Sequence, residues 1–246
     1  MALVALAVWC FIVALAGGLV GLVLGNLRLP LMLLVASSPA AGAGANLVVS
    51  AVSAATAAIT HVRAGRINWR LVAWMAPPSI AAAVIGGWLA GEVPRRALLL
   101  GIAAVLLFSG IQLLRRPERA TRGDGGGLDI RAAVLSGAGI GLLGGFVGLI
   151  LGSLRMPALL RMVGEVPARA VGTNVTIGAG VGVAGALGHG FSVAPDLTAA
   201  AVGAAASIPG ALLGARLTGR LSEPQLVRAI GIVLLVAGLA TGLEAL

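Results

Sequence analysis

Long stretches without any charged residue alternate with short polar segments along this chain. The charge-free stretches are residues 1–27, 29–60, 71–91, 97–114, 132–154, 170–195 and 197–215. A helix needs about 20 mainly apolar residues to cross the hydrocarbon layer of a bilayer, and most of these stretches reach that length. The pattern therefore predicts an all-α integral membrane protein that crosses the membrane several times.

One Gly-rich motif occurs twice, at the same point of each half of the chain. The segment GGLVGLVLGNLRLP at residues 17–30 returns as GGFVGLILGSLRMP at residues 144–157. In each half, a long apolar segment leads into the motif, and a short apolar piece and three more long segments follow it. These segments are 3–24, 31–37, 40–60, 71–91 and 95–114 in the first half, and 131–151, 158–163, 168–188, 197–218 and 224–243 in the second. The sequence therefore predicts about eight transmembrane helices in two homologous four-helix repeats.

The piece that follows each motif is too short to cross a bilayer by itself. Residues 29–60 as one helix would be about 48 Å long at about 1.5 Å per residue, well beyond the hydrocarbon thickness of about 30 Å. Pro39 also interrupts a continuous helix there. We therefore predict that residues 31–37 and 158–163 are Pro-led half-helices, either re-entrant or interfacial, within a Gly/Pro-interrupted segment. If both pieces crossed fully, each half would have an odd number of crossings and the halves would be inverted.

A polar, Arg-rich segment separates the two repeats. Its Gly125-Gly126-Gly127 run is typical of a flexible linker. We predict a first transmembrane repeat at residues 1–114, a linker loop at 115–130 and a second transmembrane repeat at 131–246. Eight crossings would put both termini on one side of the membrane. The loop Arg residues are shared almost evenly between the two sides, so the positive-inside rule does not identify that side.

Composition supports the membrane prediction and excludes several classes of protein. Apolar residues make up 59% of the 246 residues and charged residues 10%, and the mean hydropathy is +1.07. A soluble protein of this size could not cover so much apolar surface. The net charge is +9 and every basic residue is Arg, so a Walker A motif, which needs Lys, is excluded. The Arg residues lie in short loops, where they suit the headgroups of the lipid bilayer and not a nucleic acid.

Nothing in the sequence predicts an enzyme, a cofactor or a metal centre. A metal site needs several His, Cys or acidic residues that converge, and the apolar stretches carry few of them. No Ser lies in a nucleophile elbow. The expected function is therefore transport or assembly within the membrane.

Arg28 and Arg155 occupy the same position in the two motifs and are the first candidates for a binding site. A charged side chain at membrane depth costs about 2.5–3.5 kcal/mol on insertion scales, so a matched pair needs a use. Each Arg lies next to a Pro, which suits the first turn of a helix. The free N–H groups of a helix N-terminus attract anions, as does an Arg fork, so two copies facing each other would form one anion site near the midplane. The alternative is that both side chains snorkel to lipid headgroups.

Other residues of the motifs and of the following helices extend the candidate site. A Gly at the break would let a ligand approach the backbone. The amide and hydroxyl groups nearby are either ligand donors or interhelical hydrogen bonds. Besides the two Arg residues, the candidate substrate-binding residues are Gly25, Gly152, Asn26, Ser153, Asn46, Asn174 and Thr173.

Two histidines and one acid are the candidates for proton coupling. His61 and His189 are the only histidines and lie at equivalent positions of the two halves. Because His titrates near neutral pH, both are candidates for coupling to H⁺; the alternative is that they cap helix ends. Asp196 could join His189 in a relay or pair with a loop Arg.

Several short segments follow one another in a recognisable order. They are the breaks into Arg28-Leu29-Pro30 and Arg155-Met156-Pro157, the segment Val166-Pro167 through Thr173, the turn with His61, Gly65 and Ile67-Asn68-Trp69, and residues 85–89 and 213–217. This order resembles the TauE/SafE family of bacterial and archaeal membrane proteins, the sulfite exporter family, over nearly the whole chain. Where that family commonly has three consecutive Gly before the Pro, this sequence keeps only Gly25. The resemblance implies movement of small anions, often sulfur oxyanions or organosulfonates, across the cytoplasmic membrane, with proton or ion coupling.

We therefore expect a multi-pass permease of the cell membrane that moves a small anion by alternating access. The anionic substrate, a coupling H⁺ or other ion and the lipid bilayer are its expected partners. A passive anion channel and a non-transporting membrane scaffold are the alternative interpretations. The sequence leaves open the substrate, the direction of transport, the coupling ion and whether the protein forms a homodimer.

Overall fold

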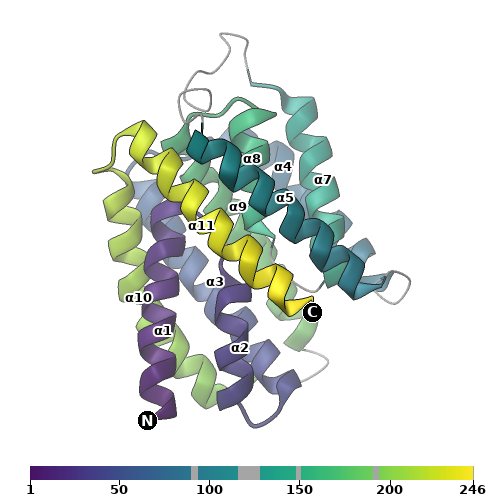
Figure 1. The fold of residues 1–246 in the computed structure, drawn as a ribbon, viewed down its shortest axis with the longest axis vertical. Coiled ribbons are helices and arrows are strands. Elements are labelled where there is room, and N and C mark those ends of the chain that lie inside the picture. The colour runs from purple at the N-terminus through teal and green to yellow at the C-terminus, as the bar shows by residue number, and fades with distance from the viewer. Residues whose placement is uncertain (90–93, 116–127, 148–150, 191–193, 246) are drawn as a thin grey trace.

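Every regular element in the described part of the chain is a helix, which confirms the all-α prediction. Figure 1 shows the computed structural model, which describes residues 1–89, 94–115, 128–147, 151–190 and 194–245. The first half contains α1 (Ala2–Val20), α2 (Gly25–Val35), α3 (Pro39–Arg63), α4 (Trp69–Trp88) and α5 (Arg95–Arg115). The second half contains α7 (Ile130–Val147), α8 (Gly152–Arg161), α9 (Pro167–Gly190), α10 (Leu197–Thr218) and α11 (Glu223–Glu244). Most of the predicted linker at 115–130 lies outside the described residues.

Helices of membrane-spanning length lie in both halves. Among the described residues, five helices are long and apolar enough to cross a bilayer: Ala2–Val20, Pro39–Arg63, Arg96–Arg115, Leu197–Thr218 and Glu223–Glu244. These lengths agree with a multi-pass membrane protein. The number of eight crossings stays a prediction.

The two short helices begin earlier than we expected. We predicted Pro-led half-helices at 31–37 and 158–163, and those starts are wrong, because α2 begins at Gly25 and α8 at Gly152, with a Pro inside each helix. The physical reason is that α1 ends at Gly21, which has φ 69° and ψ 28°, a left-handed conformation that Gly adopts without strain. The chain is therefore free to start a new helix before the Arg. As a result, Arg28 and Arg155 are carried near the start of each short helix.

The most extensive helix pairs each join one helix of the first half to one of the second. α1 packs along α10, α4 along α7, α3 along α9 and α5 along α11. Figure 1 shows α5 and α11 side by side across the front of the molecule. Exchanging the two halves turns the α1–α10 pair into the α7–α4 pair and leaves the other two pairs unchanged. The apolar core is therefore shared between the halves.

The equivalent helices α1 and α7 run in opposite directions. In Figure 1, α1 rises from the N-terminus at the lower end, whereas α7 descends from the upper end. α1 is parallel to its neighbour α10, because Ser207 donates to the Cys10 carbonyl in the middle of α1 and Thr218, later in α10, donates to the Leu19 carbonyl near the end of α1. The two halves therefore have inverted orientations in the molecule.

Backbones touch directly where α1 meets α10 and where α4 meets α7. A Cβ at Gly214 would lie 2.1 Å from the Leu15 carbonyl oxygen, and a Cβ at Gly86 would lie 2.2 Å from the Leu142 carbonyl oxygen. These two contacts occupy equivalent positions of the two halves. Only Gly permits helices to approach so closely, so both positions exclude any other residue without a shift of the helices.

Candidate functional site

The interruption between α1 and α2 leaves a helix N-terminus inside the protein. α1 ends at Gly21, whose N–H donates to the Gly17 carbonyl, and α2 begins after Leu24 with no side chain capping its first N–H groups. α8 begins in the same way after Leu151, again without a side-chain cap. The first N–H groups of a helix lack intrahelical partners and carry a partial positive charge. Each half therefore presents an uncapped positive helix end.

The two interruptions meet, and Asn174 holds them together. Its Nδ2 donates to the Gly21 carbonyl at 2.8 Å and to the Gly152 carbonyl at 2.9 Å. A Cβ at Gly152 would lie 3.4 Å from the Val23 backbone nitrogen. One amide on α9 thus bonds the backbone of both breaks, although the breaks are far apart in the sequence.

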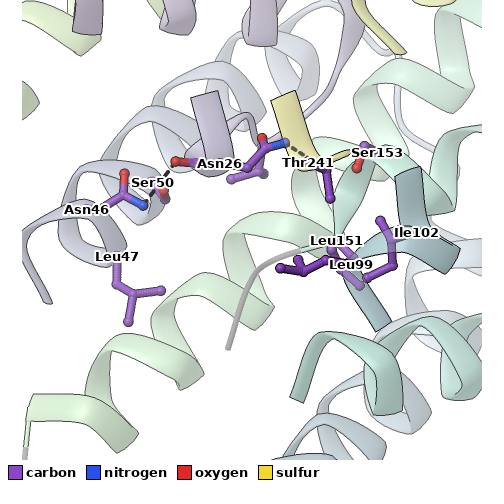
Figure 2. Close-up of a pocket in the computed structure, with 11 residues that line it drawn as sticks. Asn26, Asn46, Leu47, Ser50, Leu99, Ile102, Leu151, Ser153 and Thr241 are labelled. Atoms are coloured by element: carbon purple, nitrogen blue, oxygen red, sulfur yellow. Dashed lines mark hydrogen bonds between the residues drawn. The ribbon is translucent and has the colours of Figure 1, made fainter. Parts of the chain in front are cut away.

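A small cavity lies between the starts of α2 and α8. Figure 2 shows the polar side chains of its wall, which belong to Asn26, Asn46, Ser50, Ser153 and Thr241. Gly25 also lines it. Apolar side chains such as Leu99 and Leu151 form the rest of the wall. About 20 Å³ of it is open to the centres of water-sized molecules, which is room for one or two waters. The cavity is therefore too small, in this conformation, for an ion of several atoms.

Arg28 is held firmly by α3. Its guanidinium is 1% exposed; Nε donates to Asn46 Oδ1 at 3.1 Å and Nη2 donates to Ser50 Oγ at 2.5 Å. Asn46 in turn donates to the Gly25 carbonyl at 3.1 Å. Arg28 does not line the cavity of Figure 2 but borders a smaller one beside α1.

Arg155 is equally buried but has fewer hydrogen bonds to the residues that the structure describes. It is 1% exposed, and Nη1 donates to Asn174 Oδ1 at 3.3 Å. Its Nε is buried and has no hydrogen-bond partner. Arg155 does not line the cavity either, but it lies one helical turn beyond Leu151, which does. Neither Arg reaches the outer surface of the protein.

The two guanidiniums have no acidic partner among the residues that the structure describes. One ion pair in that part of the chain joins Arg169 to Glu165, at 3.0 Å, and does not involve either guanidinium. A buried cation without a counter-charge is costly, unless a ligand supplies that charge. The interior therefore holds uncompensated positive charge beside two positive helix ends.

Comparison with known proteins identifies the family. The family model described as sulfite exporter TauE/SafE matches residues 6–241. This chain belongs to the TauE/SafE family. It is accordingly a multi-pass membrane protein of a transporter family, and members of that family are transporters, not enzymes. No curated protein and no solved structure gave a significant match.

Three further candidate residues of this TauE/SafE chain differ in their distance from the cavity. Asn26 lines it and donates to Thr241 Oγ1 at 3.0 Å. Ser153, which is buried, also lines it. Thr173 is buried elsewhere, where its Oγ1 accepts a hydrogen bond from the Asn68 backbone N–H at 2.9 Å. The structure thus brings Asn26 and Ser153 to the cavity, whereas Thr173 of α9 contacts the backbone just before α4.

His61, in the last turn of α3, packs beside the end of α1 and does not line the cavity. It is fully buried, and its Nε2 donates a hydrogen bond to the Gly18 carbonyl oxygen at 3.3 Å. Thr218 donates to the neighbouring Leu19 carbonyl at 2.8 Å. The other ring nitrogen of His61 is buried without a partner. His61 therefore helps to satisfy the last carbonyls of α1, and the side chain of His189 lies outside the described residues.

Asp196 caps the start of α10. Its carboxylate accepts hydrogen bonds from the Ala199 N–H at 2.9 Å and the Ser37 N–H at 3.0 Å. These backbone donors, Ala199 first, hold the pKa of Asp196 below its ordinary value. Asn68 has the equivalent role in the first half, because its Oδ1 accepts from the Leu71 N–H.

Two residues with buried polar contacts, Ser50 and Glu165, were not among the candidates from the sequence. Ser50 binds Arg28 and lies one helical turn after Asn46, a spacing that puts both on one face of a helix and could have revealed it. Glu165 is 1% exposed and accepts from Asn68 Nδ2 at 2.5 Å and from Arg169 Nε at 3.0 Å. No sequence signal joins Glu165 to Asn68, because they lie in different halves.

Proposed function

We propose that this protein is a secondary transporter that moves a small anion, a sulfur oxyanion or an organosulfonate, across the cytoplasmic membrane by alternating access. The observation that carries the proposal is the pair of buried guanidiniums, Arg28 and Arg155, without an acidic partner among the described residues. Each is attached to a short helix whose N-terminus borders one central cavity. Membership of a transporter family supports the same function.

Electrostatics favour an anion over a neutral or cationic substrate. A unit negative charge about 4 Å from a guanidinium is attracted by about 4 kcal/mol at an effective dielectric constant of about 20. The two helix ends add roughly half a positive charge each. A sulfite-like anion has several oxygens that accept hydrogen bonds, so it would use the uncapped N–H groups, Asn26 and Ser153 as well as the guanidiniums.

The size of the cavity points to an occluded conformation. A space for one or two waters does not admit a sulfonate, so the site must open before the substrate enters or leaves. Inverted halves suit this mechanism, because each half would open toward the opposite side of the membrane. Inversion also needs an odd number of crossings in each half, which the short helices α2 and α8 provide if each completes a return crossing. Because α1 lies along α10 and is long enough to cross a bilayer, this proposal gives each half five crossings in place of four.

The proposal also includes coupling of transport to protons. His61 is the candidate that the contacts favour, because one of its ring nitrogens is buried without a partner beside the end of α1. Protonation would charge His61 next to the first break and could link H⁺ to the movement of the anion. His189 is kept as its equivalent in the second half, and Asp196, already engaged as a helix cap, as the third candidate.

The test is transport by purified protein in proteoliposomes. Sulfite, ethanesulfonate and acetate are offered separately, and we expect saturable uptake that is strongest for a sulfur anion. The double variant Arg28→Ala/Arg155→Ala should lose it, whereas Arg63→Ala, an exposed loop-side control, should retain it. Undiminished flux in the double variant would refute the site. Flux that never saturates would indicate a channel, and absence of both flux and anion binding would indicate a scaffold.

A further inference from the structure

The two guanidiniums occupy equivalent positions but have different surroundings. Arg28 donates to an amide at 3.1 Å and to a hydroxyl at 2.5 Å. Arg155 donates to an amide at 3.3 Å, and its buried Nε is without a partner. Buried polar groups are nearly always hydrogen-bonded, so the unpaired Nε needs an explanation that Arg28 does not.

The cause of the difference is one pair of equivalent residues on the helices that follow. In α3, Ser50 comes one turn after Asn46, and both bind Arg28. In α9, the residue one turn after Asn174 is Gly178. Gly has no hydroxyl, so α9 offers Arg155 only the amide of Asn174. The asymmetry is therefore encoded by Ser50 in one half and Gly178 in the other.

We propose that the two Arg residues have separate roles: Arg155 donates hydrogen bonds to the transported anion, and Arg28 is a positioning residue. This inference rests on the proposed function. Arg28 is already bound to α3, and Asn46 links it to the Gly25 carbonyl, so Arg28 fixes the start of α2. Arg155 keeps an unused donor that an oxyanion oxygen would accept, which is the stronger, charge-assisted type of hydrogen bond.

The position of Asn174 explains how such binding would reach both halves. Asn174 accepts from Arg155 and donates to the carbonyls of both breaks. An anion that draws the guanidinium away from Asn174 would loosen the group that joins the breaks. Asn46 donates to the Gly25 carbonyl of its own break, and the residue equivalent to Gly21 in the second break lies outside the described residues. The anion-sensing residue is therefore Arg155, not Arg28.

The first decisive variant adds a hydroxyl at residue 178. Gly178→Ser places a hydroxyl where α3 has Ser50, so it should bind Arg155 and compete with the anion. Gly178→Ala is the matched control, because a Cβ at Gly178 would lie 2.8 Å from Val23 Cγ2 in both variants. Sulfite binding to purified protein, measured by calorimetry, should be at least tenfold weaker in Gly178→Ser than in Gly178→Ala.

Ser50→Ala and the two Arg→Gln variants test the other role. Ser50→Ala should lower the melting temperature of the anion-free protein, because it removes the hydroxyl that holds Arg28. Arg155→Gln should raise the Kd at least tenfold more than Arg28→Gln does, which keeps the test decisive if a residue 178 variant does not fold. Equal losses in the two Gln variants, or equal Kd values for Ser and Ala at 178, would overturn the division of roles. Wild-type protein that binds none of sulfite, sulfate or ethanesulfonate would overturn the proposed function itself.

Discussion

Asn174→Asp tests whether the uncompensated charge of Arg155 is what attracts the anion. The substitution replaces the amide nitrogen by a carboxylate oxygen, next to a guanidinium that now donates to Oδ1 at 3.3 Å. At that distance and an effective dielectric constant of about 20, opposite unit charges attract by about 5 kcal/mol. A tenfold change in affinity corresponds to about 1.4 kcal/mol. The built-in carboxylate would therefore take the place of the substrate, and we expect sulfite to bind at least a hundredfold more weakly.

Asn174→Ala is the control, because it removes the same two hydrogen bonds to the Gly21 and Gly152 carbonyls without adding a charge. Each lost bond costs about 1 kcal/mol, and more where a carbonyl stays buried and unpaired, so both variants should melt earlier than the wild type. Calorimetric titration with sulfite then separates the two effects. If Asn174→Asp bound sulfite as tightly as Asn174→Ala, the charge of Arg155 would not be what attracts the anion.

Three other predictions follow from the packing and the loops. On a Cys10→Ala background, Ala64→Cys and Ala194→Cys should react with an impermeant thiol reagent from opposite sides of the membrane, and labelling from one side would contradict the inverted halves. Gly214→Leu should cost about 2 kcal/mol or more through overpacking against the Leu15 carbonyl, seen as a lower melting temperature, whereas Gly101→Leu, with no atom within 4 Å, should not. The pKa of Asp196 is held below its ordinary value of 3.8 by the amides of Ala199 and Ser37, so its stabilisation is complete above that value and is lost as the pH falls through the lower folded-state pKa. Asp196→Asn, which keeps a capping oxygen, should therefore reduce the acid-side fall in melting temperature, and an unchanged fall would exclude that role.

Hydrophobic patterning predicted the long helices well because most of them follow largely charge-free runs bounded by Arg, Gly or Pro. It failed at the starts of the short helices. Pro30 suggested a helix start, but Gly21 ends α1 and lets α2 begin at Gly25. A Pro inside a short helix costs free energy, and contacts with other helices must offset that cost. A local sequence pattern does not show those contacts.

The candidate site was only partly readable for a similar reason. The repeat identified Arg28, Arg155, Asn46 and Asn174, because matched polar residues stand out in apolar segments. It did not indicate that Asn174 binds the backbone of both breaks, since the Gly21 contact joins opposite halves. The contrast between Ser50 and Gly178 was visible in the sequence, but its meaning depends on an unpaired Arg155 nitrogen that only coordinates reveal.

The backbone contacts at Gly214 and Gly86 determine which parts can move. A Cβ at either Gly would overlap a neighbouring carbonyl, so these backbones are in contact and resist sliding. Under the proposed alternating access, α1 with α10 and α4 with α7 would therefore each move as a rigid body. Each of these bodies is a hybrid, with one helix from either side of the ancestral duplication. Under that proposal the moving parts would not coincide with the repeats, and the hinges would lie along α3 and α9, on which α10 and α4 pack.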